Sequence, residues 1–87
     1  MDSKITEYTE YCLLCGVPTV EPHHCLNGSD RRHADEDGLV IPLCRVCHRW
    51  VHDNPKALVM TKIIGQLAYE REHTREEFRA RYRHSYL

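Results

Sequence analysis

Leu43-Cys44-Arg45-Val46-Cys47-His48-Arg49-Trp50-Val51-His52 is the stretch on which the fold depends. Cys44 and Cys47 form a C-x-x-C pair, and His48 and His52 have the four-residue spacing that places two side chains on one face of a helix. A second C-x-x-C pair and a tandem histidine pair lie upstream: Cys12, Cys15, His23 and His24. About half of the chain therefore holds more potential metal ligands than one ion needs.

These ligands divide into two sets by their chemistry. The two C-x-x-C pairs together suit a closed tetrahedral zinc site, because thiolates are soft ligands and leave no open position. His48 and His52 could share a second metal with one histidine of the tandem pair, which would leave positions open for water or substrate, as in catalytic sites. The other member of the pair would point to the opposite face of an extended segment and could act as a general base.

The tandem histidines followed by H-x-x-x-H resemble the HNH endonucleases, most closely the bacterial DNase toxins of the colicin type. The two C-x-x-C pairs are similar to those of zinc-containing HNH proteins of phages and prophages. This resemblance, which spans Cys12 to His52, implies a ββα-metal (His-Me finger) core. It also implies that His23, His48 and His52 bind the catalytic metal and that His24 is the general base.

The chain departs from the HNH pattern at the middle Asn, which in that family fixes a loop through backbone hydrogen bonds. Leu39 stands at the corresponding position before His48. Asp37 is the predicted substitute, because Asp and Asn both hydrogen-bond to local backbone in turns. Asn27 is the less favoured alternative.

We expect the 87 residues to form one small α+β domain, with a ββα-metal core held by the four-cysteine zinc site over residues 12–54 and a C-terminal helical extension over 55–87. Residues 39–41 should form a strand antiparallel to the segment around His24. Residues 26–38 read as a polar loop, because Asn27-Gly28 is a strong turn signal.

Three features of the helical part are predicted from side-chain pattern. A helix over residues 55–72 carries an imperfect apolar stripe of Leu58, Ile63, Ile64 and Leu67. Trp50 is expected in the core. A last helix should begin at Thr74 with a capping box to Glu77, and its aromatic residues should pack inward: Phe78, Tyr82 and Tyr86.

The charge distribution neither supports nor excludes nucleic-acid binding. The net charge is −1, with −5 over residues 1–40 and +4 over residues 41–87. Arg45 and Arg49 are candidates for phosphate contacts beside the histidines, as are Arg31 and Arg32 in the predicted loop. Ordinary solvated charges remain the alternative for each of them.

Composition also sets expectations about the compartment. No apolar run is long enough to cross a bilayer, and the N-terminus lacks the plan of a signal peptide. We therefore expect a cytoplasmic protein, in a bacterial host cell if the phage resemblance holds, where C-x-x-C pairs bind metal rather than form disulfides. Cys25 is left over and is expected to be a small buried residue.

The predicted function is that of a metal-dependent DNA endonuclease, nicking or cutting both strands. Its cofactors would be a structural Zn²⁺ and one catalytic divalent metal. Three imidazoles without a carboxylate favour Zn²⁺, Ni²⁺, Co²⁺ or Mn²⁺ over Mg²⁺, although availability in the cell could select Mg²⁺. DNA is the expected partner, and the resemblance extends this to phage packaging or recombination proteins. The alternative is a non-catalytic zinc module that binds nucleic acid or protein and needs only the cysteines.

Overall fold

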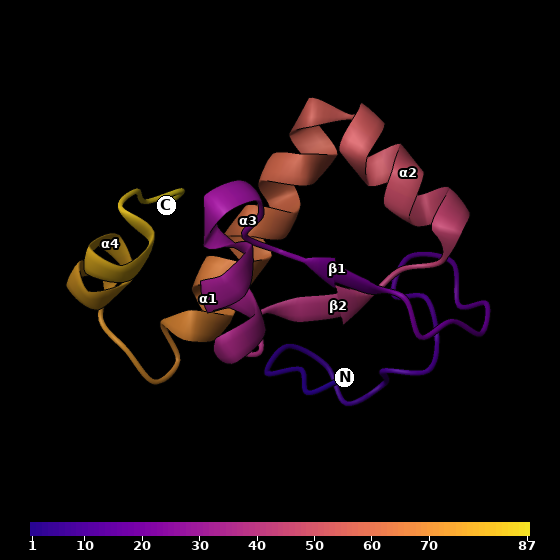
Figure 1. The fold of residues 1–87 in the computed structure, drawn as a ribbon, viewed down its shortest axis with the longest axis horizontal. Coiled ribbons are helices and arrows are strands. Elements are labelled where there is room, and N and C mark those ends of the chain that lie inside the picture. Colours follow the sequence, from indigo (N-terminus) through magenta and orange to yellow (C-terminus); the bar gives the residue numbers. More distant parts are fainter.

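The computed structural model describes residues 1–87 as a small α+β fold, as predicted. A two-stranded antiparallel sheet is surrounded by four α-helices and one short 3-10 helix (Figure 1). In chain order the elements are β1 (Pro22–His24), η1 (Gly28–Asp30), α1 (Arg31–Glu36), β2 (Val40–Pro42), α2 (Arg45–Asp53), α3 (Pro55–Tyr69) and α4 (Arg75–Tyr82). No helix combines the length and the apolar character needed to cross a membrane.

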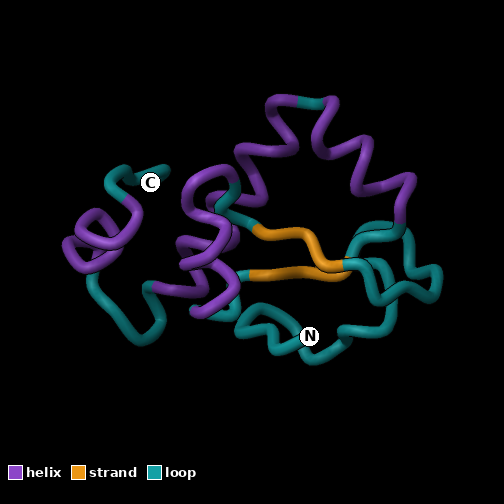
Figure 2. Tube along the Cα trace, viewed as in Figure 1, coloured by secondary structure: helices purple, strands orange, loops and turns teal.

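The sheet places the tandem histidines. β1 pairs with β2 antiparallel, so that His23 lies opposite Ile41 and His24 opposite Val40. The predicted strand and its partner are thus confirmed. β2 is fully buried, and the first residues of the chain run beside it, where Ser3 Oγ donates to the Val40 carbonyl at 2.6 Å. Figure 2 shows that the chain before β1 is loop.

The connection between the strands is not the loop that the turn residues predicted. After Asn27-Gly28 the chain forms η1 and then α1, so Arg31 and Arg32 lie on a helix. Ala34, the one apolar residue of α1, is completely buried. The helix has six residues and only this side chain faces the core. One apolar residue forms no periodic pattern, so the sequence does not indicate the helix.

α2 turns a different face inward from the one expected. Val51 is buried, whereas Val46 and Trp50 are 77% and 54% exposed. The prediction of a core Trp50 was wrong, because residues four apart share a helical face and Val46 and Trp50 together occupy the face that points away from the sheet.

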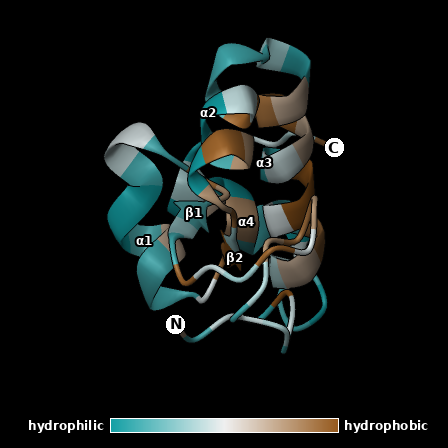
Figure 3. Ribbon diagram, turned by 90° about the vertical axis from the view of Figure 1, so that its right-hand side faces the viewer, coloured by the Kyte–Doolittle hydropathy of each residue, from teal (hydrophilic) through white to brown (hydrophobic).

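α3 packs on β1 through small residues rather than through its large apolar ones. Ala57, Thr61, Gly65 and Ala68 are buried. Of the Leu58–Leu67 stripe, Leu58 packs half-buried against the core, Ile63 and Ile64 are half-buried, and Leu67 is 53% exposed, so the stripe is not the most buried face of the helix. A Cβ at Gly65 would lie 2.8 Å from both Cys25 Cβ and Leu26 Cδ2. The glycine therefore permits α3 to approach Cys25 and Leu26 closely. Figure 3 shows apolar residues along the rest of that helix. Cys25 is fully buried, as expected.

α4 closes the far end of the core. Its capping box between Thr74 and Glu77 is present as predicted, with Thr74 Oγ1 accepting from the Glu77 amide at 3.1 Å. Phe78 and Tyr82 are buried and Tyr86 packs partly buried against the same cluster, as predicted.

Candidate metal centre

The four cysteines of the two C-x-x-C pairs meet at one end of the sheet. Cys12 and Cys15 come from the N-terminal loop and Cys44 and Cys47 from the start of α2, and their sulfur atoms lie within 4.8 Å of one another. The turn after Cys15 depends on Gly16, whose φ of +81° favours glycine. Cys44 is the N-cap of α2 and accepts a hydrogen bond from the Cys47 amide at 3.4 Å.

The electrostatics of this cysteine cluster favour a bound cation. Burial raises the pKa of Cys12, but hydrogen bonds from the backbone of Cys44, Cys15 and Leu14 outweigh it and lower that pKa to about 6. The neighbouring Cys44 sulfur, together with desolvation, raises the pKa of Cys47 to about 12. Close thiolates therefore cannot all ionise without positive charge, which a divalent metal supplies. The cluster is compatible with a structural metal site.

Three histidines from β1 and α2 form a second cluster of potential metal ligands. His23 comes from β1 and His48 and His52 from α2, and one nitrogen of each lies within 4.8 Å of the others. The ring centroids are 5.1 Å apart for His23 and His48, 5.3 Å for His23 and His52, and 4.9 Å for the two helical rings. The helical spacing thus places the two α2 imidazoles beside the first histidine of the tandem pair.

His23 is 1% exposed and has one free ring nitrogen. Its Nε2 lies 3.0 Å from Thr61 Oγ1, while its buried Nδ1 has no hydrogen-bond partner. Desolvation, followed by repulsion from His48, His52 and His24, lowers the pKa of His23 to about 4. At neutral pH the ring is therefore neutral and carries a lone pair, as a metal ligand requires.

His48 is oriented by a carboxylate. Its Nδ1 lies 3.4 Å from Glu21 Oε2, which leaves Nε2 free. Glu21 is not among the site residues predicted from the sequence. The sequence pattern could have indicated it: Glu21 and His23 are two residues apart in an extended segment, so their side chains share a face, and Glu21 therefore lies on the side where His23 meets His48.

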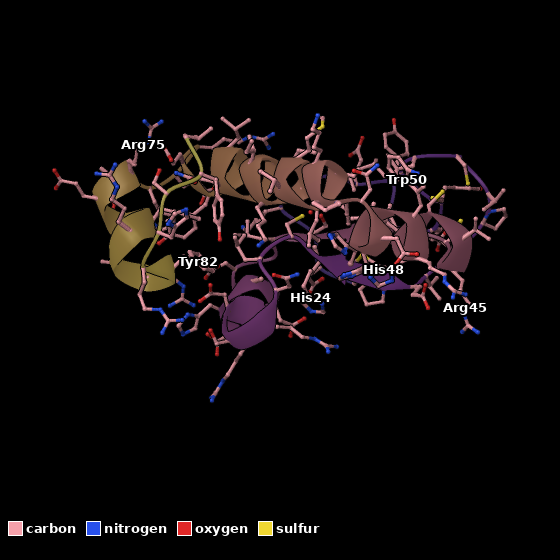
Figure 4. The ribbon with its side chains drawn as sticks, turned by 90° about the horizontal axis from the view of Figure 1, so that it is seen from above. His24, Arg45, His48, Trp50, Arg75 and Tyr82 are labelled. Carbon is pink, nitrogen blue, oxygen red and sulfur yellow. The ribbon has the colours of Figure 1, made fainter.

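His24, the predicted base, points to the other side of β1. Its Nε2 lies 3.2 Å from Oδ1 of Asp35 on α1, and in Figure 4 His24 lies near α1 whereas His48 lies on α2. Asp35 is not among the predicted site residues, because residues 26–38 were predicted to form a loop. A carboxylate near the end of a short helix gives no local signal of its tertiary partner.

Asp37 does not make the contacts predicted for it. Its Oδ2 accepts from Arg81 Nε and from the Tyr82 hydroxyl, both at 2.6 Å, and so ties the end of α1 to α4. The expected hydrogen bonds to local backbone are replaced because a carboxylate near a guanidinium forms a stronger, charge-assisted pair.

The four candidate arginines flank the histidines on two sides. Arg45 and Arg49 line a shallow hollow together with Glu21, His48 and His52. A second hollow, next to His24 and Asp35, is lined by Arg31 and Arg32. Each hollow thus combines imidazole and guanidinium groups, and Figure 4 shows Arg45 projecting at the outer end of α2.

The chain belongs to the family of proteins of unknown function designated DUF968, whose model matches residues 4–73. The matched region contains both ligand clusters, His24 and α3, and ends before α4. No curated protein and no solved structure matches the chain.

Proposed function

We propose that this protein is a metal-dependent DNA endonuclease of the ββα-metal type. The observation that supports this most strongly is the meeting of three imidazoles from β1 and α2, one of them buried with an unpartnered nitrogen. A fourth imidazole is held on the opposite face of the same strand by a carboxylate. The order β1, β2, α2 also fits a ββα core.

His23, His48 and His52 would hold the catalytic ion. Nδ1 of His23 and Nε2 of His48 are the nitrogens left free by their partners Thr61 and Glu21. A divalent cation held there supplies positive charge to the scissile phosphate and to the leaving 3′ oxygen. Imidazole ligands suit Zn²⁺, Ni²⁺, Co²⁺ or Mn²⁺, and Mg²⁺ is the weakest match.

His24 would remove the proton from the attacking water. An Asp35 carboxylate only accepts hydrogen bonds, so His24 Nε2 carries the hydrogen and Nδ1 is the nitrogen that can take a proton. Asp35 thereby fixes the tautomer of the base and stabilises the imidazolium that forms. Histidine suits this role because imidazole both accepts and releases a proton in the range of cellular pH.

The remaining groups have supporting roles. The cysteine cluster would bind a structural Zn²⁺ that fixes the start of α2, and with it His48, relative to the N-terminal loop. Arg45 and Arg49 on one side and Arg31 and Arg32 on the other would contact the phosphates that flank the cut. Such backbone contacts carry little sequence information, so we expect low sequence specificity.

A plasmid-cleavage assay tests the proposal. Supercoiled DNA is incubated with the zinc-loaded protein and Mg²⁺, Mn²⁺, Ni²⁺, Co²⁺ or Zn²⁺. His24→Ala should lower the rate by about 10²–10⁴-fold while both metal sites still fill. The matched control is His84→Ala, an exposed histidine on the C-terminal tail, which should cut like the wild type.

The alternative of a non-catalytic zinc module makes a different prediction. It needs the cysteine cluster alone, and the exposed apolar residues around that cluster, Leu13, Leu14 and Val17, favour a protein partner. Absence of cutting with every metal, by protein whose two sites are both filled, would replace the nuclease with this module.

A further inference from the structure

The imidazole of His23 is hydrogen-bonded to a residue of α3, a helix that follows β1, β2 and α2 in the chain. Thr61 Oγ1 lies 3.0 Å from His23 Nε2, and both side chains are buried. The same hydroxyl lies 2.8 Å from the carbonyl oxygen of Leu58, one turn earlier in α3. A side chain 38 positions away in the sequence thus contacts His23, the first of the tandem histidines.

Thr61 makes two hydrogen bonds, and together they determine which group is the donor in each. A backbone carbonyl can only accept, so the Thr61 hydrogen goes to Leu58. The hydroxyl oxygen is then an acceptor, and His23 Nε2 must be the donor. In a neutral imidazole only one nitrogen carries hydrogen, so Nδ1 bears the lone pair.

The environment of Nδ1 matches this tautomer. Nδ1 is buried without any hydrogen-bond partner and its ring lies against those of His48 and His52. If the hydrogen were on Nδ1 instead, a buried donor would be left unpaired, which folded proteins rarely tolerate. With the lone pair on Nδ1, by contrast, His23 could bind a cation together with the imidazoles of His48 and His52.

We propose that Thr61 is a positioning residue for the three-imidazole metal site: its hydroxyl locks His23 in the Nε2–H tautomer and aims Nδ1 at the metal. The proposal deepens the proposed function and rests on it for the identity of the ligands. Partners of this kind orient metal-binding histidines and commonly alter metal affinity when removed.

The first test reads the tautomer directly, by ¹⁵N–¹H correlation through the His23 ring in protein that retains the cysteine-bound zinc but has been stripped of the second metal. We expect hydrogen on Nε2 and an unprotonated Nδ1. Hydrogen on Nδ1 in the wild type would overturn the proposal, whatever the protein does to DNA.

The second test measures Co²⁺ binding at the histidine site by visible absorption. Thr61→Val, which keeps the shape and removes the hydroxyl, should weaken binding by about 10–100-fold and mix the tautomers. Thr61→Ser keeps the hydroxyl and should bind like the wild type, and one zinc per chain in each variant shows that the fold is intact. Equal Co²⁺ affinity in wild type and Thr61→Val would overturn the proposal, even if the wild type cuts DNA. A wild type that binds Co²⁺ with the expected Thr61 dependence but never cuts would overturn the nuclease alone.

Discussion

Substitution of Gly65 by Ala tests whether the close approach of α3 to β1 is required. The new Cβ would lie 2.8 Å from Cys25 Cβ and 2.8 Å from Leu26 Cδ2. The Leu26 methyl is the end of a flexible side chain and can rotate away. Cys25 Cβ is bonded to the backbone that follows β1, so relief of that contact requires the helix or the strand to move.

Two opposing effects set the magnitude of the change in stability. Replacing Gly by Ala inside a helix gains about 1 kcal/mol of intrinsic propensity, whereas overpacking a dense core costs about 1–3 kcal/mol. Because one contact is with a fixed atom, we expect the cost to fall in the upper part of that range. The free energy of unfolding should drop by about 1–2 kcal/mol, equivalent to a Tm lower by roughly 4–16 °C for a domain of this size.

The assay is urea and thermal unfolding of zinc-loaded protein, combined with a double-mutant cycle. In a Cys25→Gly background the fixed Cβ is absent, so the cost of Gly65→Ala should shrink or reverse. Metal binding at the histidine site should weaken in Gly65→Ala, because Thr61 lies one turn away on the same face of α3. A Gly65→Ala protein as stable as the wild type would show that α3 does not need a residue without a side chain at this contact, and the expected loss of stability would then be wrong.

Three more substitutions test the base, the cysteine cluster and the contact between α1 and α4. Asp35→Ala should slow plasmid cleavage by about 10-fold or more without changing Co²⁺ affinity at the histidine site, and a fall in affinity instead would place Asp35 with the ligands rather than with the base. Cys12→Ser should release the zinc and lower the free energy of unfolding by more than about 4 kcal/mol, as read from metal content and urea melts, whereas retention of one tightly held zinc per chain would exclude Cys12 as a ligand. Asp37→Asn should weaken the charge-assisted bonds to Arg81 and Tyr82 and cost about 1–2 kcal/mol, with faster amide exchange in α4, and unchanged exchange there would contradict the assigned role.

The ligand clusters could be predicted from the sequence because their geometry is mostly local. The spacing of His48 and His52 fixes one face of a helix, and the C-x-x-C spacing brings two sulfurs of one turn together. The capping box of Thr74 was likewise predictable, since all of its hydrogen bonds join residues three apart.

The contacts that orient the histidines could not be predicted in this way. Asp35 and Thr61 lie 11 and 38 residues from their partners, so only the packing of α1 and α3 on β1 brings them there. The most buried face of α3 could not be predicted for a related reason: a hydrophobic pattern favours the largest apolar side chains, whereas close contact with the chain around β1 selects small residues such as Gly65.

The proposed function requires the chain to hold two metals in separate sites with different ligands. X-ray absorption at the zinc and nickel edges tests it on protein that contains zinc and has been loaded with one equivalent of Ni²⁺. We predict zinc surrounded by sulfur alone and nickel surrounded by imidazole nitrogen and oxygen, with one of each metal per chain. Sulfur around the nickel, displacement of the zinc, or failure to hold a second metal would show that the chain does not have two separate sites of this kind.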